Sequence, residues 1–144
     1  MKSNNNLEKN TELIIYCDGG SRGNPGPAGL GAVIYDVDKN ILEEISEYLG
    51  VTTNNQAEYR AVLKAIEKAK DMQATKLTFY LDSELIVKQM SGEYKVKNKD
   101  LLPIYLKIRQ YILEFSQVNF FHVRREYNKE ADSLANLAMD KKGN

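Results

Sequence analysis

The stretch LIIYCDGGSRGNPGPAGLGAVIYDV, residues 13–37, decides the fold predicted for this chain. It begins with a continuous apolar run, residues 13–17, which is typical of a strand buried in the middle of a sheet. Asp18 ends that run, and the Gly- and Pro-rich residues 19–29 predict an irregular loop. Residues 30–37 return to an apolar strand pattern. The stretch therefore predicts two strands joined by a loop, with an acid where the loop begins.

The rest of the chain predicts a third strand and then alternates between helices and strands. The third strand is expected over residues 41–50. A helix is expected over residues 52–72, because its apolar positions repeat every 3.6 residues, with Thr53 or Asn54 as its N-cap. The remaining predicted elements are a strand at 76–82, a short helix capped by Ser83 and ending at Met90, a helix at 101–115, a strand at 118–125 and a helix at 128–142.

This order of elements predicts an α/β fold built on one mixed five-stranded sheet. The first, fourth and fifth strands are separated by helices, so they are expected to be parallel neighbours. The second and third strands are expected to extend the sheet as an antiparallel edge, and helices to cover both faces. We expect a single domain over residues 12–142, preceded by a polar, disordered leader at residues 1–11.

Composition narrows the possible functions. No apolar run approaches the ~20 residues of a membrane-spanning helix, and the N-terminus lacks the apolar core of a secretory signal. The single cysteine, Cys17, permits no internal disulfide and fits a reducing cytoplasm. The 20 basic and 20 acidic residues balance. This argues against tight nonspecific binding of nucleic acid, but it allows acids gathered in a cleft with bases at its rim.

Four acidic residues occupy positions where an unpaired carboxylate would be costly to bury. Asp18 and Asp82 each follow an apolar strand, and parallel neighbouring strands would place them side by side at the carboxyl edge of the sheet. Glu58 and Asp132 lie near the starts of two helices. Close carboxylates repel unless a cation lies between them, and such oxygen ligands suit Mg²⁺ or Mn²⁺. Each acid alone also fits a helix-dipole or capping preference, so only the set of four predicts a metal site.

Four blocks of sequence resemble the type 1 ribonuclease H family, in that family's order and at its spacing. The resemblance covers about residues 12–140 and ends in the pattern N-x-x-x-D at Asn128 and Asp132. It implies the family fold and hydrolysis of the RNA strand of an RNA/DNA hybrid to 5′-phosphate and 3′-hydroxyl products. The blocks are YCDGGSRGNPGPAGLGAVIY at 16–35, TTNNQAEYRAVLKAI at 52–66, FYLDSELIVKQM at 79–90 and EYNKEADSLANLA at 126–138.

The same resemblance implies roles for individual residues. Asp18 is implied to bridge two metal ions, with Glu58 and Asp82 sharing the first ion and Asp132 helping to hold the second. Two Mg²⁺ ions, replaceable by Mn²⁺, are therefore the implied cofactor. Some matched positions are implied to read 2′-hydroxyls, which separate RNA from DNA, and others to border a phosphate pocket for the DNA strand. The positions matched to substrate contacts are Gly19, Gly20, Ser21, Asn24, Thr53, Asn54, Asn55, Ser83 and Asn128.

The sequence departs from the best-known bacterial members in two segments. The connection before Asn128 is too short for their histidine-bearing loop, and His122 falls inside the predicted strand, where a structural role is expected. Arg124, Arg125, Glu126 and the C-terminal lysines are candidates to replace the loop histidine. Residues 91–102, SGEYKVKNKDLL, are too short for the family's basic handle. We therefore predict weak hybrid affinity, with reduced contacts from Lys95, Lys97 and Lys99.

Three functions stay open on the sequence alone. The first is an active, hybrid-specific endoribonuclease, which the presence of all four acids favours. The second is a catalytically weak or silent module that binds hybrids or structured RNA. The third is another nuclease of the same superfamily, such as an exonuclease or an integrase-like core. We expect a cytoplasmic monomer that has no obligate protein partner and does not associate with membranes.

Overall fold

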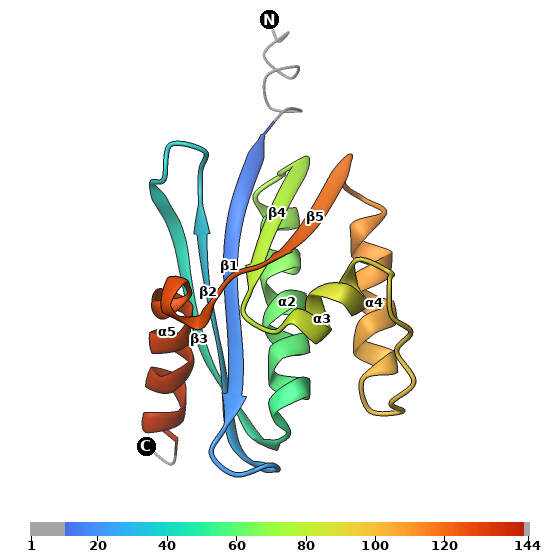
Figure 1. The fold of residues 1–144 in the computed structure, drawn as a ribbon. Helices are drawn as coiled ribbons and strands as arrows, with labels where there is room; N and C mark the ends of the chain where they lie inside the picture. The colour runs from blue at the N-terminus through green and yellow to red at the C-terminus, as the bar shows by residue number, and fades with distance from the viewer. Residues whose placement is uncertain (1–10, 143–144) are drawn as a thin grey trace, which may run out of the picture.

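The computed structural model describes residues 11–142, and its centre is a mixed five-stranded sheet (Figure 1). β1 is parallel to β4, and β4 is parallel to β5, while β2 and β3 add to the sheet in antiparallel order. The predicted α/β architecture is therefore confirmed. In the spatial order β3-β2-β1-β4-β5, the strands are β3 (Ile41–Thr52), β2 (Gly26–Tyr35), β1 (Glu12–Ser21), β4 (Lys76–Leu81) and β5 (Gln117–His122).

Helices cover both faces of the sheet, as the sequence predicted (Figure 1). The predicted N-caps are also correct, because Thr53 Oγ1 accepts a hydrogen bond from Gln56 N and Ser83 Oγ accepts one from Ile86 N. No helix within residues 11–142 has the length and apolar character needed to cross a membrane. The helices are α2 (Asn54–Asp71), α3 (Glu84–Met90), α4 (Leu102–Ile112), the 3₁₀ turn η1 (Arg125–Tyr127) and α5 (Lys129–Asp140).

The main core lies between the sheet and the layer that contains α2 and α4. Leu13, Ile15 and Cys17 of β1 are buried in it, and the residues between them are more exposed. Successive side chains of a strand point to opposite faces, so one face of β1 packs on α2 and the other turns toward α5. The leader expected at residues 1–11 lies outside the described residues, except for Thr11.

β1 continues beyond the apolar run that predicted it. The irregular loop predicted over residues 19–29 is confined to residues 22–25, because the residues from Asp18 to Ser21 pair with β2, which begins at Gly26. Glycine is required at Gly19, where a Cβ would lie 2.3 Å from the carbonyl carbon of Ala57 in α2. Asp18 therefore lies inside a rigid strand.

β5 ends at His122 instead of at residue 125, and the chain then turns through η1 toward α5. His122 is exposed, whereas Phe120 is the buried residue of this strand. His122 thus lies inside the strand, as predicted, but it is not a core residue, and its structural role stays a prediction. It shares the face of Phe120 but lies at the end of the strand, where its side chain remains in contact with solvent.

Candidate active site

Three of the predicted acids come together at the carboxyl end of the parallel strands. The register that pairs Tyr16 with Tyr80 places Asp18 and Asp82, two residues further on, beside each other. Glu58 reaches them from α2, whose backbone packs directly on Gly19. Ligand oxygens of the three carboxylates all lie within 4.8 Å of one another. Oxygens this close can share a divalent cation, and carboxylates are the ligands that Mg²⁺ and Mn²⁺ prefer.

The fourth acid, Asp132, joins this group from the other side of the sheet. It lies in the first turn of α5, and its carboxyl group shares a hydrogen bond with that of Asp18. Asp18 thus has Asp82, Glu58 and Asp132 as charged neighbours. The structure therefore brings all four predicted acids to one edge of the sheet.

Burial and mutual repulsion make this cluster costly to ionise without a cation. Desolvation, followed by repulsion from Asp82 and the hydrogen bond with Asp132, raises the pKa of Asp18 well above its usual range. Desolvation and repulsion from Asp82 raise the pKa of Glu58 to about 8, and the nearby Arg125 partly offsets this. A divalent cation would remove both penalties. These residues therefore fit a divalent metal site.

Asn128 ties the strand ends to the start of α5. Its side-chain amide donates to the carbonyl oxygen of Cys17 at 2.9 Å and to Asp82 Oδ2 at 3.2 Å. The backbone carbonyl oxygen of Asn128 accepts a hydrogen bond from Asp132 N at 3.1 Å. Asn128 is only 1% exposed, so in this conformation it positions the acids. Its predicted contact with substrate stays a prediction.

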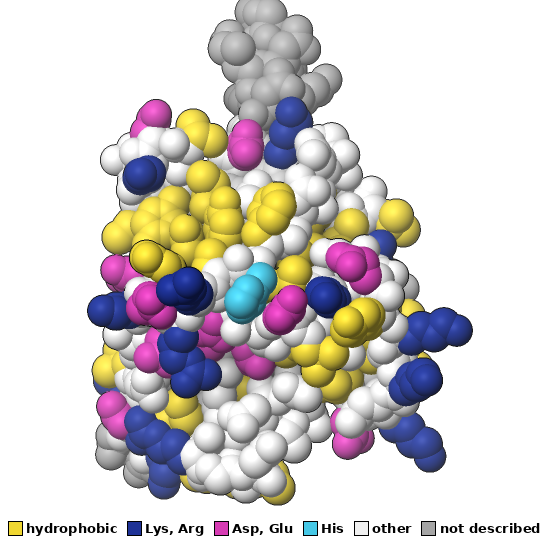
Figure 2. Space-filling view, in the orientation of Figure 1, with side chains coloured by type: hydrophobic (Ala, Val, Ile, Leu, Met, Phe, Trp, Pro, Cys, Tyr) yellow, Lys and Arg dark blue, Asp and Glu magenta, His cyan; other side chains and the backbone are white. Residues whose placement is uncertain are grey.

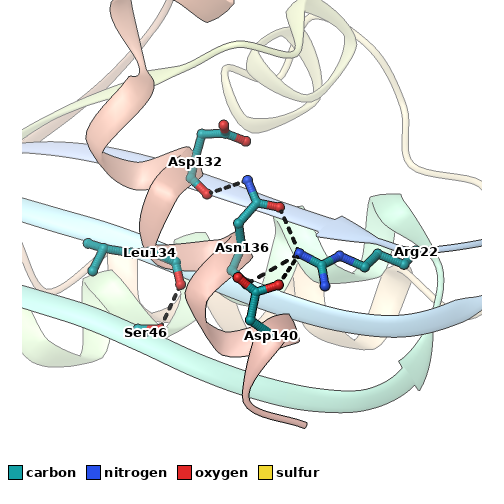
Figure 3. A network of polar contacts seen from close by, with 6 residues as sticks. All are labelled: Arg22, Ser46, Asp132, Leu134, Asn136 and Asp140. Atoms are coloured by element: carbon teal, nitrogen blue, oxygen red, sulfur yellow. Dashed lines mark hydrogen bonds and ion pairs between the residues drawn. The ribbon is translucent and has the colours of Figure 1, made fainter.

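A polar network fixes the C-terminal part of α5 to the turn that follows β1 (Figure 3). Arg22 Nη2 lies 2.7 Å from Asp140 Oδ1, and the same nitrogen donates to Asn136. The amide of Asn136 donates in turn to the carbonyl oxygen of Asp132 at 3.1 Å. The helix that carries Asp132 is therefore connected to the strand that carries Asp18 at two points, through Asn128 and through Arg22.

A second group of predicted residues forms a polar pocket at the start of α2. Asn24 Oδ1 accepts from Asn54 N at 3.0 Å, and Asn54 Oδ1 accepts from the backbone nitrogen and the hydroxyl of Ser21. Asn24, Thr53, Asn54 and Asn55 line a cavity of about 280 Å³. The structure thus gathers these predicted positions around a polar cavity beside the N-terminus of α2.

Sequence reasoning missed four residues of this pocket, Gln56, Asn98, Asp100 and Leu101. Asn98 Oδ1 accepts from the backbone nitrogens of Asp100 and Leu101, which forms the turn before α4. An Asn followed by a helix is a recognisable turn signal, but it does not reveal that the turn lies against α2. Ser83 lies outside this pocket, because it caps α3 immediately after Asp82.

This sheet order, with an acidic cluster at the carboxyl end of β1 and β4, defines the ribonuclease H-like class of metal-dependent nucleases. Residues 16–138 match the family model described as "Reverse transcriptase-like". Ribonuclease HI of Halobacterium salinarum is 40% identical over 133 residues, which cover 92% of this chain and 67% of that protein. The chain belongs to the type 1 ribonuclease H family.

Solved structures give the same result. The N-terminal ribonuclease H domain of a Mycobacterium tuberculosis protein has a TM-score of 0.88 and 44% identity, and the match covers 90% of this chain and 94% of that one. LC11 ribonuclease H1, solved in complex with an RNA/DNA hybrid, has a TM-score of 0.86 and 46% identity over 90% of this chain and 97% of that one. The full-length M. tuberculosis relative is named a bifunctional protein, and this chain spans only 36% of its length.

Proposed function

We propose that this chain is an endonuclease that hydrolyses the RNA strand of RNA/DNA hybrids with two divalent metal ions, Mg²⁺ by preference and Mn²⁺ as a substitute. The observation that carries the proposal is the cluster of Asp18, Glu58 and Asp82, whose oxygens lie within 4.8 Å of one another. The similarity to LC11 ribonuclease H1, which was solved with a hybrid, supports the choice of substrate.

Under this proposal, the four acids would hold the two metal ions in different combinations. Asp18 has both Asp82 and Asp132 as electrostatic neighbours, so it would help to hold both ions, with Glu58 and Asp82 sharing the first and Asp132 helping to hold the second. Asn128 donates to one oxygen of Asp82 and thereby orients that carboxylate. Bound divalent ions would supply activation of a water molecule and stabilisation of the leaving 3′-oxygen, giving 5′-phosphate and 3′-hydroxyl ends.

The substrate-binding residues are proposed to act in two groups. The pocket lined by Asn24, Thr53, Asn54 and Asn55 would take a phosphate of the DNA strand, since neutral donors at a helix N-terminus suit phosphate oxygens. The remaining positions would contact the RNA strand near the acids, where 2′-hydroxyls are available. They are Gly19, Gly20, Ser21, Ser83 and, after a rearrangement that exposes it, Asn128.

We further propose that the chain binds hybrids weakly. Lys95, Lys97 and Lys99 are exposed and form no ion pairs within residues 11–142, so they are free to approach phosphates. Asp100, however, lies at the rim of the polar pocket and opposes them. A few surface lysines provide few released counterions, which limits affinity at physiological salt. A monomeric state and a cytoplasmic location also remain proposals, and the single Cys17 is compatible with the latter.

The test is cleavage of an end-labelled RNA strand in a hybrid, with Mg²⁺ or Mn²⁺, by the wild type, Asp82→Asn and Asp38→Asn. Asp38 is a matched control, because it is an exposed aspartate in the turn after β2. The wild type and Asp38→Asn should cut the RNA strand, and Asp82→Asn should lose on the order of a hundredfold or more in rate. Asp82→Asn should still retard hybrid in a gel, because the groove contacts are intact.

Two results would contradict the proposal. An intact hybrid with the wild type in both metals, together with gel retardation, would identify a silent hybrid-binding module. Equal cleavage by the wild type and Asp82→Asn would show that the hydrolysis does not use this cluster.

A further inference from the structure

A row of aromatic side chains crosses four neighbouring strands, outside the acidic site. Tyr35 of β2, Tyr16 of β1, Tyr80 of β4 and Phe121 of β5 follow one another with ring centroids 5.8, 4.9 and 5.8 Å apart. The strand register pairs Tyr16 with Tyr80, and Tyr80 with Phe121. Because the alternate residues of β1 face α2, this row lies on the opposite face of the sheet.

Most of this face has no helix over it. α5 packs on β1, β2 and β3, which leaves the aromatic row beyond its N-terminal end. Figure 2 shows hydrophobic side chains gathered over the upper parts of β2, β1 and β4, above the segment that crosses from β5 to α5. Phe121 is 49% exposed, and Tyr127, on the crossing segment, is 66% exposed. An exposed aromatic surface of this kind is typical of a contact site.

A cavity of about 400 Å³ opens on this face, and half of the residues that line it are tyrosines. Tyr16, Tyr35 and Tyr80 line it from the sheet, and Tyr127 lines it from the crossing segment. None of the four acids of the proposed active site lines it. The cavity is therefore a separate site that shares β1 and β4 with the acidic cluster.

The charge around this cavity is negative. Asp36 and Glu130 are among its lining residues, against one cation, Lys39. Hydrogen bonds from Asn40 and from the backbone of Asp38 stabilise the Asp36 carboxylate. Glu130 forms no ion pair or side-chain hydrogen bond within residues 11–142.

The negative charge of Glu130 acts on the tyrosine side chains of the cavity. After burial, repulsion by Glu130 contributes to the raised pKa of Tyr35. A phosphate would meet repulsion here, so the chemistry of the cavity disfavours nucleic acid. A cation would gain from the carboxylates and from the aromatic rings together.

We propose that this cavity binds the guanidinium group of an arginine presented by a basic segment of a partner protein. Arginine fits better than lysine, because its planar group stacks on tyrosine rings while its N–H groups donate to carboxylates such as Glu130. The cavity takes the side chain, and the exposed Phe121 and Tyr127 provide apolar surface for the residues that flank the arginine. The site would dock a partner beside the acidic cluster without covering it.

The test is a titration of ¹⁵N-labelled protein, without metal, with the peptide acetyl-Gly-Arg-Gly-amide. The matched probe replaces arginine with citrulline, which has nearly the same shape and no charge. Saturable shifts at the backbone amides of Tyr16, Tyr35 and Tyr80 are expected, with affinity at least about threefold higher for arginine than for citrulline, as a surface cation–π contact and a carboxylate imply. Oligothymidine serves as the nucleic-acid probe.

Two variants locate the interaction, each with a matched control. Glu130→Gln and Tyr35→Leu should each weaken arginine binding at least about threefold, while Glu93→Gln and Tyr94→Leu, on exposed residues that do not line the cavity, should not. The unperturbed resonances of each variant report whether it is folded, and Glu130→Gln alters no packed contact. Equal binding of citrulline, shifts located elsewhere, or stronger shifts of the same amides by oligothymidine would overturn the proposal.

Discussion

The side-chain amide of Asn128 donates a hydrogen bond to Oδ2 of Asp82 at 3.2 Å, which joins the start of α5 to the end of β4. The same nitrogen reaches the carbonyl oxygen of Cys17, the residue before Asp18. One buried amide therefore fixes the relative position of the two strand ends that carry acids. The side-chain oxygen of Asn128 has no hydrogen-bond partner among the described residues, so the side-chain nitrogen provides this link.

Replacement of Asn128 by Ala should reduce catalysis more than it reduces substrate binding. Loss of the amide frees Asp82 to turn away from the cluster, and groups that orient metal ligands are typically worth about 10- to 100-fold in metal affinity or activity. The measurement is the rate of hybrid cleavage as a function of metal concentration, together with hybrid affinity without metal. A fall in hybrid affinity with an unchanged metal requirement would instead support the predicted substrate contact of Asn128.

The two adjacent glycines after Asp18 should differ in their tolerance of a methyl group. In Gly19→Ala the new Cβ would lie 2.3 Å from the backbone of Ala57, whereas in Gly20→Ala its nearest neighbour is Asn54 Oδ1 at 3.7 Å. Gly19→Ala should cost about 1–3 kcal/mol or more in the free energy of unfolding, because α2 must move away. Gly20→Ala should stay within ~0.5 kcal/mol. Denaturant unfolding measures both, and equal losses would show that α2 does not pack on Gly19.

The metal-free protein should lose stability as the pH rises. The pKa of Glu58 is raised from 4.5 to about 8 in the folded state, so between these values the folded protein binds more protons than the unfolded chain. The free energy of unfolding then decreases with increasing pH over this window. Asp18 acts in the same direction, because its pKa is also raised. Melting temperatures in a chelator, measured from about pH 5 to about pH 8, test the sign.

Glu58→Gln provides the control for this pH effect, because it removes the titrating group and keeps its shape. The variant should show a flatter profile and a higher melting temperature than the wild type at the alkaline end. Mg²⁺ should restore part of the lost stability in the wild type by occupying the site. A wild-type profile that rises through the window would contradict the raised pKa of Glu58.

The ion pair between Arg22 and Asp140 should contribute little to global stability, despite its short distance of 2.7 Å. Its side chains are 45% and 61% exposed, and pairs in contact with solvent are typically worth less than ~1 kcal/mol. A double-mutant cycle with Arg22→Gln and Asp140→Asn measures the coupling energy. The pair of Lys70 and Glu114, at 2.8 Å and similar exposure, is the reference. A coupling of several kcal/mol for Arg22 and Asp140 would show that α5 depends on this contact.

Most of the fold follows from local patterns that act within a few residues. The apolar run before Asp18 predicted a central strand, the 3.6-residue repeat predicted α2, and Thr53 and Ser83 were identified as caps that the structure confirms. The alternation of helices and strands then led to the parallel arrangement of β1 and β4. That arrangement was sufficient to predict that Asp18 and Asp82 are neighbours.

Local sequence patterns did not predict the contacts between distant segments. The extension of β1 through Ser21 depends on pairing with β2, and the placement of Asn98 beside Asn54 depends on how the turn before α4 meets α2. The exposure of His122 was not predicted, because periodicity does not report where the residues that cover a strand end. None of these relationships has a signature in its own segment of sequence.

The sequence by itself determined the four acids, the types of the elements that carry them and the order of those elements. Hydrophobic periodicity and capping act locally, so they can be recognised without knowledge of the packing. Only the tertiary structure decided the burial of Asn128 against Asp82, the effect of Arg125 on Glu58 and the aromatic cavity around Tyr16. Each of these relationships joins residues that are far apart in the sequence, so it is a property of the packed molecule.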